Sequence, residues 1–177
     1  MKPQATDYPS FYAPYLLAVD NDNLELALEQ QIRQFDMVFS GITEEQANAA
    51  YAPGKWSMKE VLGHILDAER IFAYRALSFA RGEQQAQPGF DEDSYVAIAR
   101  FNHQSVDDLL FQFMYTRKST LLLLRSFSEE ELSRSGTANG KQITVNALFW
   151  IMAGHAQHHF NVLKERYLTN SGSAVQA

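Results

Sequence analysis

The sequence predicts an all-α protein, namely a four-helix bundle with short accessory helices, and three observations lead to this prediction. Four long proline-free segments, beginning near residues 23, 58, 105 and 144, are rich in apolar side chains. Each segment begins at or just after a residue type that caps helices. No segment shows a convincing apolar–polar alternation of the kind expected for half-buried strands. Side chains on facing helices of a bundle can build a site in its interior, and function is therefore sought there.

The chain is predicted to form one domain over residues 23–168, flanked by two short segments. Residues 1–22 carry three prolines among bulky aromatic side chains, so we expect an irregular arm that lies on the bundle. Residues 169–177 are small and polar, and we expect a frayed tail. The first helix should run from about Asn23 to Phe39, because apolar side chains recur at three- and four-residue steps, namely Leu24, Leu28, Ile32, Phe35 and Phe39.

The second helix has a well-marked beginning. Between residues 41 and 55, Thr43 and Gln46 form a capping-box pattern, which predicts a short helical turn followed by a loop. A second capping box pairs Ser57 with Glu60, so the long helix should begin near Met58. It should continue to about Ala80, because Gly82 follows as a stop signal.

The second half of the chain supplies two more long helices. Residues 82–91 are polar and predict a loop, and a short helix is expected at 92–101. The third long helix should extend from Ser105 to Phe127, with one more capped turn after Ser128. Residues 133–142 contain Gly136, Asn139 and Gly140 and are interpreted as a loop. Thr144 is a plausible cap for a fourth helix that runs to about Leu168.

Composition and charge exclude several function classes. The 177 residues include 15 Lys and Arg against 21 Asp and Glu, and the net charge of −6 disfavours nucleic acid as a partner. The absence of cysteine removes disulfides, thiolate nucleophiles and all-Cys zinc sites, so a tight metal site must use His, Asp or Glu. No signal peptide or membrane-spanning segment is recognisable, and we expect a cytoplasmic protein without a membrane partner.

Three of the five histidines lie close together in the fourth predicted helix. His155 and His159 are one turn apart and about 40° apart around the helix, which suits two imidazoles that bind one ion. The apolar stripe of this helix passes between them, whereas His158 falls roughly 80° away from it. We therefore assign His155 and His159 as metal ligands and place His158 at the rim. The alternative is that the pair is ordinary exposed surface or core.

A divalent ion usually needs a third protein ligand, which should come from another helix. His64, in the second turn of the second helix, is the natural candidate, because it lies at the edge of the apolar face beside Ala68 and Ile71. This position allows the His64 side chain to point into the bundle but does not require it. The remaining histidine, His103, lies in a polar stretch before the Ser105 cap and is a less favourable candidate.

The sequence also resembles a known pattern around these histidines. Trp56-Ser57 is followed by Glu60 and then by His64, eight residues after the tryptophan, and the His155 and His159 pair follows far downstream. Residues 52–55 (Ala-Pro-Gly-Lys), 67–70 (Asp-Ala-Glu-Arg) and 153–155 (Ala-Gly-His) add to the likeness, which spans roughly residues 23–168. In these motifs the chain resembles the DinB-like superfamily of metal-binding four-helix bundles, which also includes YfiT-type proteins.

This resemblance implies a metal triad of His64, His155 and His159 that binds a divalent ion such as zinc or nickel. It also implies a homodimer in many cases. Some branches of the superfamily carry out transfer or isomerisation with a low-molecular-weight thiol as cosubstrate, and other members are described as metal-dependent hydrolases. The resemblance therefore implies a DinB-like bundle without fixing one reaction.

Three neutral imidazoles leave an ion an open face, which can activate water or bind a thiolate. The sequence thus predicts a divalent-metal-dependent enzyme that acts on a small molecule, by thiol-dependent S-transferase chemistry or by hydrolysis. Two carboxylates near His64, Asp67 and Glu69, are candidates for orienting a histidine or acting as general base. We favour the alternative that they pair with Arg70, Arg75 or another arginine. A noncatalytic metal-binding or interaction bundle, related to stress responses for instance, is the alternative function.

Overall fold

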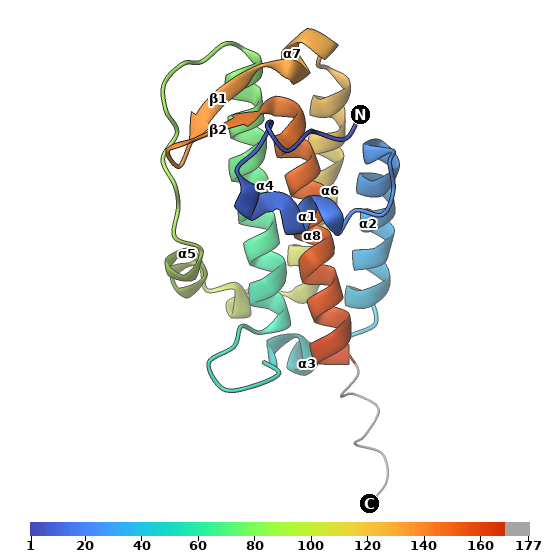
Figure 1. Cartoon of the computed structure of the whole chain (residues 1–177). Helices are drawn as coiled ribbons and strands as arrows, with labels where there is room; N and C mark the ends of the chain where they lie inside the picture. The colour runs from blue at the N-terminus through green and yellow to red at the C-terminus, as the bar shows by residue number, and fades with distance from the viewer. Residues whose placement is uncertain (169–177) are drawn as a thin grey trace, which may run out of the picture.

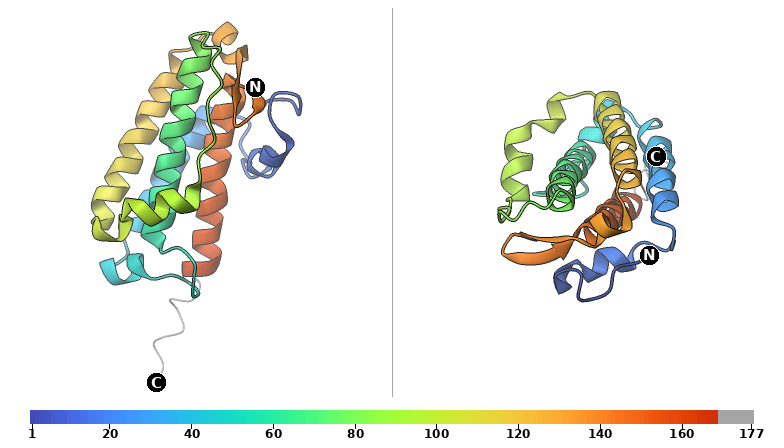
Figure 2. Two further views of the ribbon diagram at one scale, coloured as in Figure 1. Left: turned by 90° about the vertical axis from the view of Figure 1, so that its left-hand side faces the viewer. Right: turned by 90° about the horizontal axis from the view of Figure 1, so that it is seen from above.

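The computed structural model describes residues 1–168, and the tail predicted at 169–177 lies outside the described residues. Four long helices lie side by side, as Figures 1 and 2 show: α2 (Leu24–Phe39), α4 (Met58–Ala80), α6 (Val106–Arg125) and α8 (Val145–Val162). Helix α4 packs against α6 and α8, and α2 packs against the same two helices. The protein is therefore the four-helix bundle that the sequence predicts.

The capping residues predicted from the sequence begin all four long helices. The side chains of Asn23, Ser57, Ser105 and Thr144 each accept a hydrogen bond from a backbone N–H in the first turn of the helix that follows. Ser57 and Glu60 complete a reciprocal capping box, as do the corresponding residues of two short helices. The short elements are α3 (Glu44–Asn48), α5 (Glu92–Ala99), η2 (Phe101–His103), α7 (Glu129–Ser133) and the π-helical segment η3 (Leu163–Leu168), which extends α8.

The prediction of a loop at residues 133–142 is wrong from residue 135 onward, because the chain forms a β-hairpin there. Strand β1 (Ser135–Ala138) pairs antiparallel with β2 (Lys141–Thr144), and Ser135 lies opposite Thr144. The two turn residues, Asn139 and Gly140, have φ values of 50° and 70°. An Asn-Gly pair adopts such left-handed conformations readily, which matches the twist of a two-residue hairpin. The hairpin covers one side of α4 and α8 near their adjoining ends (Figure 1).

The N-terminal arm is less irregular than expected. It contains a 3-10 turn, η1 (Ser10–Tyr12), and a short helix, α1 (Ala13–Leu17), which crosses α8 (Figure 1). Pro14 does not prevent this helix, because it occupies the first turn, where a proline removes no intrahelical hydrogen bond. Gly154 makes the close crossing possible, since a Cβ atom at this position would lie 2.0 Å from the carbonyl oxygen of Tyr15.

The bundle core consists of two apolar clusters and one buried polar network. Ala153 of α8 belongs to the first cluster and Ala156 to the second, so His155 lies where the two adjoin along this helix. Near it, Arg117 of α6 donates a hydrogen bond to Glu69 of α4 at 2.9 Å and another to Gln31 of α2. Gln31 in turn donates to the carbonyl oxygen of Ala153 at 2.8 Å, so the network joins all four long helices.

The length and the apolar content of a helix decide whether it could span a bilayer. Among residues 1–168, no helix combines the length and apolar character that crossing a membrane requires.

Candidate metal centre

The three histidines proposed as ligands come together inside the bundle. His64 lies in the second turn of α4, and His155 and His159 lie one turn apart on α8, which packs against α4. The Nε2 atoms of His64 and His155 are 2.9 Å apart, and those of His155 and His159 are 3.1 Å apart. One ligand nitrogen from each of the three rings lies within 4.8 Å of the other two. The structure therefore assembles the predicted triad.

This arrangement fits a shared divalent ion better than hydrogen bonding among the rings. The Nε2 atom of a neutral imidazole carries either one hydrogen or one lone pair, so His155 cannot form two good hydrogen bonds at once. Zn–N bonds of about 2.0–2.1 Å in a tetrahedral site place two ligand nitrogens about 3.3 Å apart. The nitrogen pairs His64–His155 and His155–His159 therefore need to separate by only a few tenths of an ångström to reach this spacing.

Burial keeps the triad in the protonation state that a metal requires. Burial lowers the pKa of His64 to about 4, and the nearby Glu92 opposes this change. Burial, followed by the neighbouring His64 and His158, lowers the pKa of His159 to about 3. The pKa of His155 is also lowered well below its usual value, mainly by burial and then by His159. At neutral pH all three imidazoles are therefore uncharged, with lone pairs available for coordination.

Aromatic side chains hold the triad in place. The ring of Trp56 lies 4.9 Å from that of His64, and the ring of Tyr15 from the N-terminal arm meets His155 edge-on at 5.4 Å. Phe72, two turns after His64 on α4, also meets His155 edge-on, at 6.3 Å. These contacts restrict the rotamers of the imidazoles and so preorganise the cluster.

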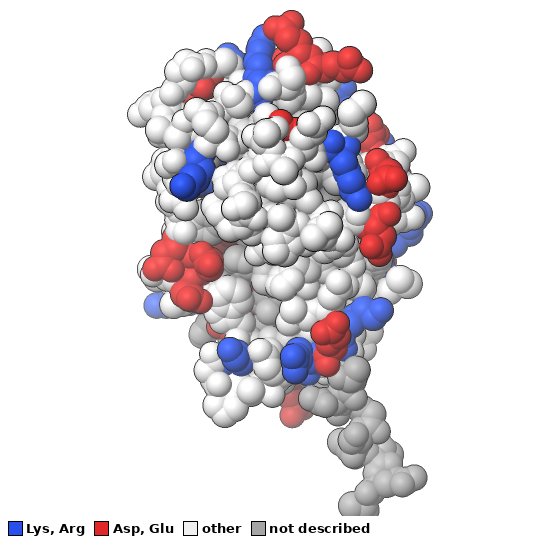
Figure 3. Space-filling model, viewed as in Figure 1, with Lys and Arg blue, Asp and Glu red and all other residues white. Residues whose placement is uncertain are grey.

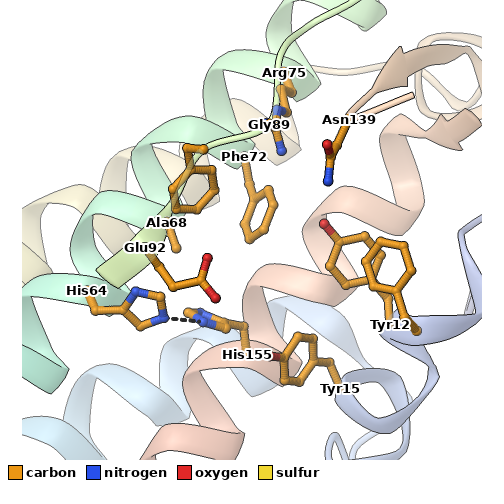
Figure 4. Close-up of a pocket in the computed structure, with 12 residues that line it drawn as sticks. Tyr12, Tyr15, His64, Ala68, Phe72, Arg75, Gly89, Glu92, Asn139 and His155 are labelled. Atoms are coloured by element: carbon orange, nitrogen blue, oxygen red, sulfur yellow. Dashed lines mark hydrogen bonds between the residues drawn. The ribbon is translucent and has the colours of Figure 1, made fainter. Parts of the chain in front are cut away.

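A pocket of about 250 Å³ opens beside the triad. His64 and His155 form its floor, and α4, the N-terminal arm, the 82–91 loop and the β1–β2 turn form its walls (Figure 4). Its volume lies slightly below the 300–1,000 Å³ that is usual for small-molecule sites. An ion at the triad would thus face a cavity of metabolite size on the side of His64 and His155.

The other histidines lie apart from this cluster. His158 is exposed, with its ring 5.1 Å from that of His159, and it is not a member of the cluster formed by the described residues. His103 is exposed in η2 and is also outside the cluster. Both positions agree with the inward and outward assignments made from the sequence.

The two candidate carboxylates of α4 both pair with arginines. Asp67 lies 3.3 Å from Arg70, and burial raises the pKa of Asp67. Glu69 is buried against Arg117, with 2.7 Å between Oε2 and the guanidinium NH2. Neither Asp67 nor Glu69 lines the pocket formed by the described residues. These two ion pairs agree with the prediction that both carboxylates pair with arginines.

Sequence reasoning missed the carboxylate that does line the pocket. Glu92, at the beginning of α5, directs its side chain toward His64 and His155 (Figure 4). Its negative charge acts on the pKa values of His64, Tyr12 and Tyr15. No spacing in the sequence links Glu92 to the histidines, because its position depends on how the 82–91 loop returns to the bundle.

The fold is a four-helix bundle in which three histidines form a cluster that could hold a metal ion, and comparison with known proteins identifies the family. The model of the DinB superfamily matches residues 27–163, and the chain therefore belongs to this superfamily.

Individual relatives agree with this assignment. The chain is 24% identical over 149 residues to the "Putative metal-dependent hydrolase OB0413" of Oceanobacillus iheyensis, and the match covers 82% of this chain and 84% of the relative. Its fold is similar to that of YfiT from Bacillus subtilis, described as "a probable metal-dependent hydrolase with an unusual four-helix bundle topology", with a TM-score of 0.76 and 16% identity over 98% of this chain and 95% of YfiT.

A further solved structure shares the fold over part of its length. This is the mycothiol-dependent maleylpyruvate isomerase, with a TM-score of 0.64 and 13% identity. The match covers 78% of this chain and 58% of the isomerase.

Proposed function

We propose that the protein is a metal-dependent hydrolase of a small molecule, in which His64, His155 and His159 bind one divalent ion, zinc or nickel. The observation that carries this proposal is the convergence of three uncharged imidazoles beside an open pocket. A structural ion is usually enclosed by four protein ligands, whereas a catalytic ion keeps a position for water or substrate. Three histidines next to a cavity match the second arrangement.

The chain's own residues supply orientation and a proton acceptor. The imidazoles hold the ion, which when bound acts as a Lewis acid on a reactant in the pocket. Glu92 directs its carboxylate toward the histidines and is the group best placed to accept a proton from the attacking nucleophile (Figure 4). Tyr12, Phe72 and the other aromatic walls limit the access of water to the reacting groups.

Thiol-dependent transfer is the second candidate reaction, and two observations favour it. The chain contains no cysteine, so a sulfur nucleophile would have to come from a small thiol. The same fold occurs in an isomerase that depends on mycothiol. In this reaction the ion would hold the thiolate of a low-molecular-weight thiol, and the pocket would hold the electrophile.

The test compares two reactions on the same metal-loaded protein. Hydrolysis of p-nitrophenyl acetate and transfer of glutathione to 1-chloro-2,4-dinitrobenzene are measured with zinc and with nickel. We expect metal-dependent turnover in the first assay, reduced about 10²- to 10⁴-fold in Glu92→Gln. Asp93→Asn, an exposed neighbour in the same helical turn, is the matched control and should retain turnover.

The outcomes separate the candidate functions. Turnover in the thiol assay alone would favour the transferase. A bound ion that raises the melting temperature without turnover in either assay would favour the noncatalytic metal-binding bundle.

We also propose that the protein is a homodimer. Helix α6 presents Phe111, Tyr115 and Leu122 on the surface, with 53%, 68% and 65% of each residue exposed. Size-exclusion chromatography with light scattering should give twice the chain mass of 20.1 kDa. A monomer at micromolar concentration would contradict this proposal.

A further inference from the structure

Arg75 is a buried cation that lacks a carboxylate partner. Among the buried residues of the described chain, three are Lys or Arg. Lys59 forms an ion pair with Glu44, and Arg117 forms one with Glu69. Arg75 is only 4% exposed, yet it has no acidic partner within residues 1–168. Because charged side chains are rarely buried without a partner, this exception points to a ligand.

The contacts of Arg75 leave most of its donors free. One guanidinium nitrogen, NH2, donates to the carbonyl oxygen of Pro88 at 2.6 Å. The guanidinium carbon lies 5.7 Å from the ring centre of Phe72 and 5.9 Å from that of Phe90. A guanidinium has five N–H donors and remains charged at neutral pH even though burial lowers the pKa of Arg75. The aromatic rings therefore fix the direction of the group while its other donors lack partners among the described residues.

Arg75 lines the same pocket as the histidine triad, at the opposite end. It lies eleven residues after His64 on α4, which corresponds to about 20° around the helix and about 16 Å along its axis. Ala68 and Phe72 lie between them on the same face and also line the pocket. Figure 4 shows Arg75 at one end of the cavity and His64 at the other.

The β-hairpin places a second polar group beside Arg75. Asn139, in the turn between β1 and β2, extends its amide toward the same end of the pocket (Figure 4). Backbone hydrogen bonds between Gln87 and the hairpin fix the turn, at 2.8 Å to Thr137 and 3.0 Å to Asn139. Gly89 leaves room for the amide, because a Cβ atom there would lie 2.6 Å from its oxygen.

We propose that Arg75, assisted by Asn139, binds a carboxylate group of the substrate, so that the substrate is a small organic monocarboxylate whose reacting group lies at the histidines. This inference rests on the proposed function only for the statement that the reacting group of the substrate lies at the histidines. A planar guanidinium matches a carboxylate with paired hydrogen bonds. A phosphate dianion fits less well, since the pocket offers one cation and also contains Glu92.

The surface around the pocket supports the choice of a single negative charge. On the face shown in Figure 3, basic and acidic side chains are interspersed, and acidic side chains gather over α5, whose first turn contains Glu92 and Asp93. Such a surface would oppose a highly charged anion. The preference for a carboxylate therefore comes from Arg75 inside the pocket, and the charge of the surrounding surface does not supply it.

The test measures binding of phenylacetate and of its uncharged analogue phenylacetamide to the metal-free protein by calorimetry. Metal-free protein is used because an ion could itself bind a carboxylate. We expect wild type to prefer phenylacetate by about tenfold or more, as expected for hydrogen bonds to a charged group. Arg75→Gln should lose this preference, whereas Arg81→Gln, which alters an exposed arginine paired with Glu131, should retain it.

Three results would overturn the proposal. They are equal binding of the two probes to wild type, no binding of phenylacetate to wild type, and an unchanged preference in folded Arg75→Gln. If Arg75→Gln fails to fold, Arg75→Lys decides, because a point charge should keep the direction of the preference but weaken it at least severalfold. Because the assay contains no metal, its failure leaves the metal proposal intact, and a failure to bind metal leaves this proposal intact.

Discussion

Replacing Glu69 by alanine tests whether this carboxylate serves the fold or the reaction. Glu69 is 2% exposed and pairs with Arg117, which is fully buried and also donates to Gln31. Alanine would leave the Arg117 guanidinium buried without its counter-charge. Breaking a buried pair in this way costs about 3–5 kcal/mol. In a domain of this size each 1 kcal/mol lowers the melting temperature by about 2–4 °C, so the expected decrease is about 6–20 °C.

Thermal denaturation followed by circular dichroism measures this effect. Glu69→Gln should be less harmful, because the amide oxygen still accepts from Arg117. Arg125→Ala is the control, since it removes exposed ion pairs to Glu25 and Glu29 and should leave the melting temperature nearly unchanged. A Glu69→Ala protein that melts like wild type but has lost turnover would refute the structural role. Glu69 would then again be a candidate catalytic residue.

Three further predictions concern the arm, the pH dependence and the rim histidine. Gly154→Ala should displace the arm, because its Cβ atom would meet the backbone of Tyr15 at 2.0 Å, and limited proteolysis should then cleave the arm faster than in Gly41→Ala, where the nearest atom is 3.9 Å away. In metal-free protein, the free energy of unfolding should fall as the pH falls from 6.5 to 4, because His64, His155 and His159 take up protons mainly in the unfolded chain over this range. The pKa of His64, about 4, alone corresponds to a loss of about 3 kcal/mol, and the other two histidines add to it. Urea denaturation at each pH measures the loss, and a flat profile would contradict the prediction. His158→Ala should bind zinc with wild-type affinity by calorimetry, and a loss equal to that of His155→Ala would show that the inward and outward assignment is wrong.

The bundle could be predicted from the sequence because its determinants are local. Ser57 and Glu60 cap α4 through side chains three residues apart, and the same kind of signal marks the other long helices. The hairpin was missed although its signal was present, since Asn139-Gly140 is a typical two-residue turn. The flanking strands are only four residues long, and their pairing depends on support from α4, α8 and the 82–91 loop.

The candidate site could be predicted in part. The spacing of His155 and His159 on one helix face indicates a shared ligand, and His64 could be added as a candidate from the edge of its own helix. Glu92 and Arg75 could not be assigned to the site, for different reasons. Glu92 reaches the pocket through loop geometry. Arg75 differs from the other buried arginine, Arg117, in having no carboxylate partner among the described residues, and a sequence does not show which charged side chains pair.

Metal content shows whether His64, His155 and His159 together hold an ion. Untagged wild-type protein, reconstituted with zinc or nickel and dialysed, is measured by elemental analysis beside His64→Ala, His155→Ala and His159→Ala. We expect about one ion per wild-type chain and a large loss in each variant, with His103→Ala as a histidine control that keeps the ion. Wild-type protein without an ion after reconstitution, or a His64→Ala variant that retains the ion with wild-type affinity, would contradict the three-histidine site.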